Sequence, residues 1–265
     1  MIRKYFEIIK NKFLTKSRTN ISKDLEKKEM GWIATIIYAS IFAVIFRSFF
    51  FEPFHIPSGS MKPNLLIGDY VFVSKLSYGY SKYSFPFGHK LNYFKGRIFF
   101  NKPKRGDVAV FRLPGDESIN YIKRIIGLPG DEIQMKKGIL YINKKPIKKQ
   151  FEGFFTESDE ADSPFSIMKY SEYLNKDKKI LILDQIIDAP QDNTITYIVP
   201  QNHYFFMGDN RDNSRDSRYY DVGFVPYENL VGKAQIIFFS NPFPAWKFID
   251  WISSIKFSRI FNKIN

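Results

Sequence analysis

The stretch Pro57-Ser58-Gly59-Ser60-Met61 divides this chain of 265 residues into two parts of different composition. Before it lies a long apolar run, and after it come short segments rich in β-branched and aromatic residues. A glycine between two serines favours a tight turn with little steric cover, which can expose the Ser60 hydroxyl as a nucleophile. Because such turns are common, an ordinary bend is the simpler interpretation of these five residues alone.

The apolar run extends from Gly31 to Phe51 and contains one charged residue, Arg47. At about 1.5 Å per residue such a helix spans roughly 31 Å, which matches a bilayer core of about 30 Å. Trp32 suits one membrane interface, and Arg47 can reach the other. The run is longer than the core of a signal peptide and no Ala-x-Ala-like site follows it. The pattern predicts one uncleaved transmembrane helix over residues 31–51.

The positive charge is concentrated beside apolar segments. The formal net charge is +13, of which residues 1–30 carry +5 and residues 245–265 carry +3. This distribution favours an anionic lipid bilayer over nucleic acid as a partner. The positive-inside rule places residues 1–30 in the cytoplasm and everything after the helix outside.

Both ends of the chain have amphipathic patterns with two interpretations each. Residues 2–13 are either a basic helix on the membrane surface, or a helix packed on protein or an unstructured tail. Residues 245–265 are either an interfacial segment or a helix docked on the domain.

The chain between these ends is predicted to be mostly β. Its turns and period-two patterns indicate one outer domain over residues 52–244, with a β-rich subdomain or insertion at about 127–205. Residues 76–105 are a predicted long loop, Glu157 to Asp162 are a predicted solvated loop, and residues 144–195 are the least readable part. The predicted strands are Tyr70–Lys75, Val108–Leu113, Ile119–Ile126, Ile139–Asn143, Ile180–Ile187, Thr194–Val199, His203–Met207 and Val231–Ser240.

The residue types present exclude several kinds of chemistry. The chain has no cysteine, which excludes a thiol nucleophile, disulfides and cysteine-ligated metals. The three histidines, His55, His89 and His203, are scattered without metal-ligand spacing. Neither His55 nor His203 has a clear carboxylate to orient it, which disfavours a Ser-His-Asp triad. We expect neither a metal nor a cofactor.

Lys123 is the better candidate for a base that activates Ser60. In a strand over Tyr121–Ile126, Lys123 and Arg124 point to opposite faces, so apolar neighbours should cover one of them. Burial disfavours the charged form of lysine, and a neutral amine can accept the proton of a serine. The alternative is an ordinary strand lysine that extends into solvent.

A third stretch, Gly208 to Tyr219, alternates carboxylate, amide, hydroxyl and guanidinium groups. A calcium loop would need the EF-hand spacing, which is missing. A solvated loop and an ion-paired scaffold beside an active site both remain compatible with this composition.

Together these residues resemble type I signal peptidase, the membrane-bound Ser/Lys leader peptidase of bacteria. The motifs that carry the resemblance occur in the family's order: Pro57-Ser58-Gly59-Ser60-Met61, Lys104-Arg105-Gly106-Asp107-Val108, Tyr121-Ile122-Lys123-Arg124 with Gly127-Leu128-Pro129-Gly130-Asp131, and Gly208-Asp209-Asn210-Arg211 through Arg218-Tyr219. The likeness covers residues 30–140 and 195–240 well and residues 144–195 poorly.

The resemblance implies a signal-peptidase-like antiparallel β-sheet protease that removes signal peptides after small residues, in an Ala-x-Ala-like pattern. It implies that Ser60 is the nucleophile, Lys123 the general base, and Ser58 with the Ser60 backbone N–H the oxyanion hole. Ser214 would orient the lysine, within a network of Asp209, Asp216 and Arg218. The residues implied in substrate binding are Ile56, Pro57, Met61, Leu65, Tyr121 and Ile122.

The same resemblance implies a place and partners. The protein would be a single-pass protein of the bacterial inner membrane, with its catalytic domain in the periplasm. Its partners would be the signal peptides of secreted preproteins, the lipid bilayer and the protein-translocation machinery.

Two other interpretations stay open at this stage. One is a self-cleaving Ser/Lys protease of the repressor type, against which the membrane anchor and the lack of a helix-turn-helix count. The other is a non-enzymatic, membrane-anchored, β-rich envelope module.

Overall fold

The computed structural model describes residues 31–85, 88, 95–156, 166–175, 178–243 and 248–264. The predicted amphipathic segment over 2–13 and the predicted acidic loop from Glu157 to Asp162 lie outside these residues. The chain divides into two units, Met1–Arg47 and Ser48–Asn265.

The N-terminal unit contributes the apolar helix, Gly31–Phe49, to the described structure. Its mean hydropathy is 1.8 and large side chains such as Trp32, Tyr38 and Phe42 are exposed along it. Among the described residues, this is the one helix long and apolar enough to cross a membrane. It ends two residues before the predicted boundary, because the chain turns at Phe50 and enters the first strand.

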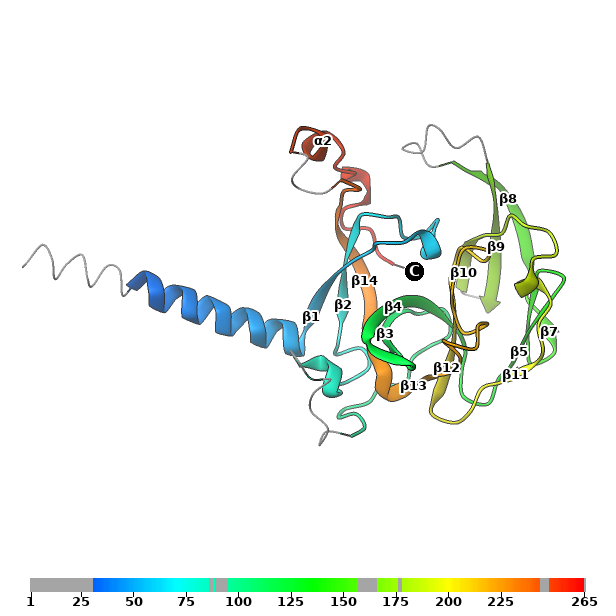
Figure 1. The fold of residues 1–265 in the computed structure, drawn as a ribbon, viewed down its shortest axis with the longest axis horizontal. Helices are drawn as coiled ribbons and strands as arrows, with labels where there is room; N and C mark the ends of the chain where they lie inside the picture. The colour runs from blue at the N-terminus through cyan, green and yellow to red at the C-terminus, as the bar shows by residue number, and fades with distance from the viewer. Residues whose placement is uncertain are drawn as a thin grey trace, which may run out of the picture. The chain divides into compact units, whose positions relative to one another are not determined.

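The second unit is built around a seven-stranded sheet with the order β1-β2-β14-β3-β4-β12-β13 among the described strands (Figure 1). Its pairings are antiparallel. The strands are β1 (Phe51–His55), β2 (Asp69–Ser74), β3 (Val108–Leu113), β4 (Asp116–Gly127), β12 (His203–Met207), β13 (Val225–Pro226) and β14 (Leu230–Ser240). The long β14 therefore returns from the C-terminal half to lie between β2 and β3.

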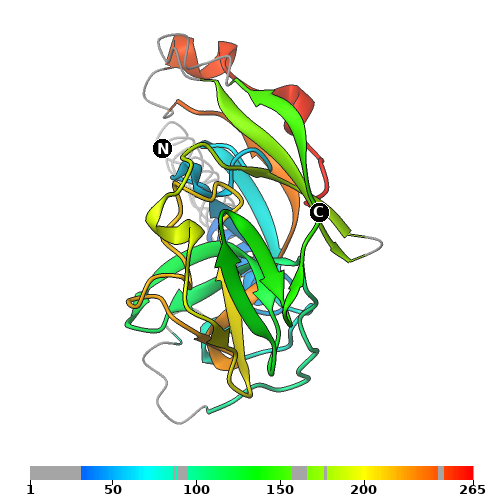
Figure 2. The same cartoon turned by 90° about the vertical axis from the view of Figure 1, so that its right-hand side faces the viewer.

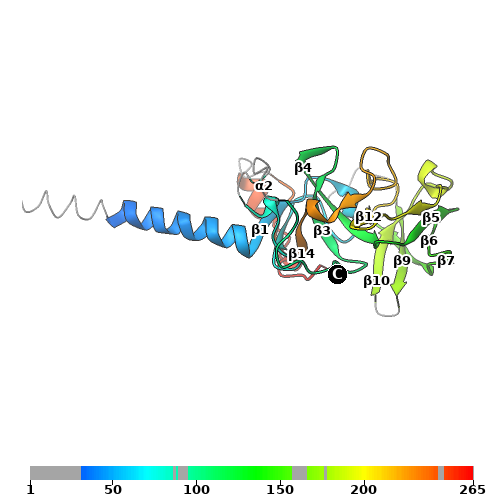
Figure 3. The same ribbon diagram turned by 90° about the horizontal axis from the view of Figure 1, so that it is seen from below.

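Two smaller antiparallel sheets form the region between β4 and β12 (Figures 1 and 3). One has the order β11-β5-β6-β7, and the other β10-β9-β8. Their strands are β5 (Glu132–Lys136), β6 (Ile139–Ile142), β7 (Lys145–Pro146), β8 (Lys149–Phe155), β9 (Ile167–Asn175), β10 (Lys178–Leu183) and β11 (Tyr197–Ile198). This region is the predicted β-rich insertion, and its strands confirm the mostly β fold class.

Helical segments in the second unit are short. They are η1 (Gly59–Met61), η2 (Lys82–Ser84), η4 (Pro190–Asp192), η5 (Tyr227–Asn229), α2 (Phe248–Ser253) and η6 (Phe257–Arg259). Figure 2 shows α2, in red, at the top of the view. The end of β8 and residues 253–259 line one open cavity of about 570 Å³.

The apolar core follows the alternation of the strands. Val108 and Val110 on one face of β3 join a cluster with Ile56, Met61 and Leu65. Ala109 and Phe111 on the other face join a second cluster with aromatic residues of β12. A third cluster fills the space between β4, β12 and the smaller sheets. Ser60 thus lies next to a core that its own flanking residues help to build.

The predicted strands differ from the structure mainly in the insertion. Val108–Leu113 and His203–Met207 match β3 and β12 at both ends. The strand predicted over Ile180–Ile187 ends at Leu183, because the Asp212 carboxylate accepts the backbone N–H groups of Gln185 and Ile186 and bends the chain. The strand predicted over Thr194–Val199 is reduced to β11.

Candidate active site

The Ser60 turn is a single turn of 3₁₀ helix, η1, at the tip of the loop that joins β1 to β2. The base of the loop is closed because Ile56 N–H donates to Asp69 O and Gly68 N–H donates to Ile56 O. Ser60 and Met61 are buried, whereas Pro57 and Ser58 are exposed. The turn therefore holds the Ser60 side chain inward while the residues just before it remain open to a ligand.

Lys123 meets Ser60 from the middle of β4. Its Nζ lies 2.5 Å from Ser60 Oγ, across 63 residues of sequence. Both residues are largely buried, with 5% and 7% of their surfaces exposed. The ammonium end also lies 5.4 Å from the centroid of the Tyr121 ring, which shares its face of β4. The structure thus brings together the predicted nucleophile and base.

The surroundings of Lys123 favour its neutral form. Burial lowers the pKa of Lys123 from 10.5 to about 8, although the charges of Asp216 and Asp209 oppose the change. A pKa near 8 leaves a large fraction of the amine unprotonated under mildly alkaline conditions. A hydrogen bond from Ser60 Oγ to this amine is the arrangement that a Ser/Lys pair needs for proton transfer.

The two other predicted serines lie close to Ser60. Ser58 Oγ is 3.4 Å from Ser60 Oγ on the exposed side of the turn. Ser214 is buried, and its Oγ has no hydrogen-bond partner among the described residues. A Cβ placed on Gly208 would lie 2.2 Å from Ser214 Oγ and 2.6 Å from Ser60 O, so these three residues converge at one point.

Asn210 holds the turn from the opposite wall. Its backbone N–H donates to Ser60 O and its side-chain amide donates to Gly59 O. Asn210 was not among the predicted site residues, because a contact with two backbone carbonyls gives no recognisable pattern in the sequence.

The predicted polar network behind the site is a set of buried ion pairs. Asp209 accepts two hydrogen bonds from Arg124, of 2.7 and 2.6 Å, and a third from the Asn64 amide. Asp216 accepts from Arg218 and from the Gly208 N–H. Burial opposes the charge on Asp216, but the Arg218 charge and these hydrogen bonds lower its pKa. The stretch from Gly208 to Tyr219 is thus an ion-paired scaffold.

The insertion is tied to this scaffold by one bidentate ion pair. Arg211 donates two hydrogen bonds, of 2.7 and 2.6 Å, to the carboxylate of Glu172 on β9. Both side chains are almost fully buried. Arg218 in turn donates to the backbone carbonyl of Arg211, so the insertion supports the wall that faces Lys123.

The predicted substrate-binding residues divide into two groups. Ile56, Met61 and Leu65 are buried in one core cluster, and Ile122 packs against it. Tyr121 instead packs on the second cluster, beside Lys123. The remaining predicted residue is the exposed Pro57.

The histidines do not approach the Ser60 hydroxyl in the contacts described. The His55 ring packs on Tyr70, with 4.8 Å between centroids. His203 Nδ1 lies 2.9 Å from Gln201 O. The remaining histidine, His89, lies outside the described residues.

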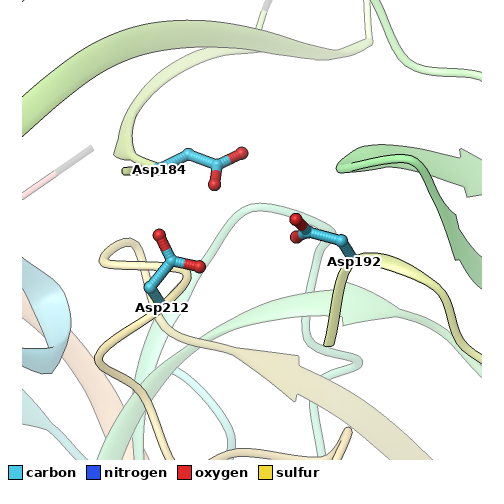
Figure 4. Close-up of side chains that lie close together, drawn as sticks. All are labelled: Asp184, Asp192 and Asp212. Carbon is cyan, nitrogen blue, oxygen red and sulfur yellow. The ribbon is translucent and has the colours of Figure 1, made fainter. Parts of the chain in front are cut away.

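Three carboxylates, those of Asp184, Asp192 and Asp212, converge within 4.8 Å of one another (Figure 4). Each of these carboxylates already binds a group of the protein itself. Asp184 pairs with Lys149, Asp192 accepts the Ala189 N–H, and Asp212 accepts two backbone N–H groups. The cluster therefore acts as a support for the surrounding loops in this structure, and its geometry alone does not indicate a metal site.

Comparison with known proteins gives the family of this chain. A family model described as signal peptidase, peptidase S26, matches residues 29–239. The chain belongs to this family. The signal peptidase I of Rickettsia prowazekii is 41% identical, with 94% of this chain and 98% of the relative covered. That of Rickettsia conorii is 40% identical, with 94% and 96% covered.

Among solved structures, a signal peptidase I from Enterococcus faecalis is 27% identical. The match covers 50% of this chain and 97% of that one, with a TM-score of 0.29, which is too low to bear on the fold. The family identity makes the protein a serine endopeptidase that removes signal peptides from exported preproteins. The interpretations as a repressor-type protease and as a non-enzymatic module are thereby superseded.

Proposed function

We propose that Ser60 is the nucleophile of this signal peptidase and that Lys123 is its general base. The observation that carries the proposal is the buried hydrogen bond of 2.5 Å between Lys123 Nζ and Ser60 Oγ. Burial also lowers the pKa of Lys123, which supports a neutral amine as the proton acceptor.

The reaction proceeds through an acyl-enzyme. Ser60 Oγ attacks the scissile carbonyl carbon while its proton passes to Lys123 Nζ. The tetrahedral intermediate then breaks its C–N bond, and the lysine ammonium gives that proton to the departing amine. Water next attacks the ester and gives one proton to Lys123. The C–Oγ bond breaks, Lys123 returns its proton to the Ser60 oxygen, and the signal peptide leaves as a carboxylic acid that loses its proton to solvent.

The oxyanion is stabilised by the Ser58 hydroxyl and the backbone N–H of Ser60. Ser58 supports this role because it is exposed on the open side of the turn, 3.4 Å from the nucleophilic oxygen. One such donor contributes about 3–4 kcal/mol to transition-state stabilisation in other serine hydrolases. Ser214 orients the Lys123 amine from the scaffold, within the network of Asp209, Asp216 and Arg218.

The signal peptide binds as an added strand between two open strand edges. Among the described strands, β1 pairs with β2 alone, and β4 pairs with β12 only through Arg124, Ile125 and Gly127. The contact between Ser60 and Lys123 brings the ends of these edges together. Ile56, Met61 and Leu65 are buried beside the nucleophile, and Ile122 packs against them. This closely packed apolar cluster forms the floor of the site and leaves room only for small residues before the cut. Pro57 and Tyr121 border the strand.

The protein is anchored in the bacterial inner membrane by the helix Gly31–Phe49, with the N-terminus in the cytoplasm and the catalytic unit in the periplasm. The helix composition and the +5 charge of residues 1–30 support this orientation. Lipid and the translocation machinery are then the neighbours that present preproteins to the site.

Replacement of either dyad residue tests the proposal. Ser60→Ala and Lys123→Met are expected to lower preprotein cleavage by about 10³-fold or more, since members of a catalytic unit fail together. Cleavage is measured with the full chain in detergent, and folding by melting temperature. Ser77→Ala and Lys179→Met, at partly exposed positions, serve as matched controls that keep activity. Near-normal cleavage by Ser60→Ala or Lys123→Met would rule out the dyad.

A further inference from the structure

Residues 255–264, here called the C-terminal strap, are hydrogen-bonded along β14. β3 pairs with β14 only from Leu230 to Lys233, which leaves the following edge of β14 available. The strap fills that edge: Ile237 N–H donates to Asn262 O, and Ile264 N–H donates to Gln235 O. The strap is thus an added piece of the main sheet.

Arg259 extends from the strap to the loop that carries Ser60. Its Nε and Nη2 donate to the two oxygens of Asp69, at 2.9 and 2.5 Å, and its Nη2 also donates to Asn64 O at 3.0 Å. The Asp69 side chain is fully buried and that of Arg259 is 18% exposed. A buried carboxylate requires such a charged partner, and the planar guanidinium fits it bidentately.

Asp69 and Asn64 hold the Ser60 loop in place through hydrogen bonds. Asp69 closes the base of the loop, and its carboxylate also accepts the Leu66 N–H. The Asn64 amide donates to Asp209, whose carboxylate is held by Arg124, the neighbour of Lys123 on β4. The loop is therefore fastened at one point to the strand that carries the base and at another to the strap.

We propose that Arg259 is a positioning residue for catalysis, which sets the Ser60 loop against Lys123 from 190 residues away. The proposal rests on the proposed dyad. Arg259 has no role in binding substrate. Arg259 acts because the distance between Ser60 Oγ and Lys123 Nζ depends on the position of the Ser60 loop. A displacement of the nucleophile by about 1 Å can lower the rate roughly 10²-fold.

The absence of cysteine allows a direct test. Ser60→Cys introduces a single thiol, whose reactivity with iodoacetamide depends on its distance from the Lys123 ammonium. In this background Arg259→Gln is expected to slow alkylation and to move its pH midpoint towards the free-thiol value of about 8.5. With Ser60 in place, Arg259→Gln should lower kcat/KM for a preprotein by roughly 10²-fold. Arg259→Lys keeps the charge but loses the bidentate geometry, and should give intermediate values.

Arg105→Gln is the matched control. The Arg105 side chain is also 18% exposed and pairs with Asp131, whose carboxylate accepts the N–H three residues earlier, at Leu128. Both glutamine variants should lower the melting temperature, but only Arg259→Gln should change thiol reactivity and cleavage.

Unchanged alkylation and cleavage in Arg259→Gln would overturn the proposal, and so would equal losses in Arg105→Gln. Failure of the dyad has a different signature, namely cleavage retained by Ser60→Ala.

Discussion

Ser60 and Lys123 are held together by single residues that come from distant parts of the chain. Ser60 and Lys123 have residue types and neighbours that indicate their roles, and the structure places them 2.5 Å apart. Asn210 and Arg259 hold the Ser60 loop through backbone carbonyls or through a carboxylate 190 residues away. Such contacts form only when distant segments pack together, so no local sequence pattern predicts them.

Gly208 has little room for a side chain beside the nucleophile. A Cβ there would lie within 2.6 Å of both Ser214 Oγ and the Ser60 carbonyl, and the carbonyl cannot move without the nucleophile. We expect Gly208→Ala to lower cleavage by roughly 10²-fold while the protein remains folded, as measured by kcat/KM and melting temperature.

Gly115→Ala is the control for this change, because its nearest neighbour, Asp221 O, would lie 3.7 Å from the new Cβ. Full activity in Gly208→Ala would contradict this expectation, because it would show that the residues around Gly208 can shift without displacing Ser60.

The strands that were predicted from the sequence have a clearer apolar pattern than those that were missed. β3 and β12 are central strands with dense apolar residues, and both were predicted at their exact ends. β8 and β9 were missed, because their side chains are largely half-buried or exposed and give no clear period. β1 was missed because it directly follows the apolar run.

The insertion contributes to the site through one pair of elements, β9 and the scaffold after β12. Glu172→Gln leaves the buried Arg211 charge without its partner, so we expect a loss of about 3–5 kcal/mol in the free energy of unfolding. Cleavage should fall with it, because Arg211 supports Arg218. Denaturant unfolding and preprotein cleavage measure the two effects.

Glu152→Gln is the control, since the side chain of its partner Lys179 is 47% exposed. This variant should leave both unfolding and cleavage nearly unchanged. If Glu172→Gln behaved in the same way, the insertion would not support the catalytic wall.

At the scale of the whole molecule, the mostly β fold class and the apolar helix follow from composition and turns. The strand order does not, because β14 comes from the end of the chain and lies between β2 and β3. The placement of β14 depends on how its apolar face packs against those of several other strands at once, and a pattern along the sequence does not encode this.

The C-terminal segment exposes large apolar side chains, and we expect them to contact the membrane surface. Ile252, just before the strap, is 52% exposed, and Phe257 and Phe261, within the strap that holds Arg259, are each 73% exposed. In the cysteine-free chain, Phe257→Cys labelled with an environment-sensitive dye should show a blue-shifted emission in vesicles compared with a labelled Ile187→Cys control. Equal emission at the two positions would place this segment in water.

If a buried, neutral Lys123 activates Ser60, the pH dependence of kcat/KM for a preprotein follows the titration of this amine. Burial lowers the pKa of Lys123 to about 8, so the amine is protonated and inactive below this pH and becomes competent above it. We therefore expect kcat/KM to rise with pH through a midpoint near 8. A midpoint near the ordinary lysine value of about 10.4, or near the histidine value of about 6.5, would contradict it.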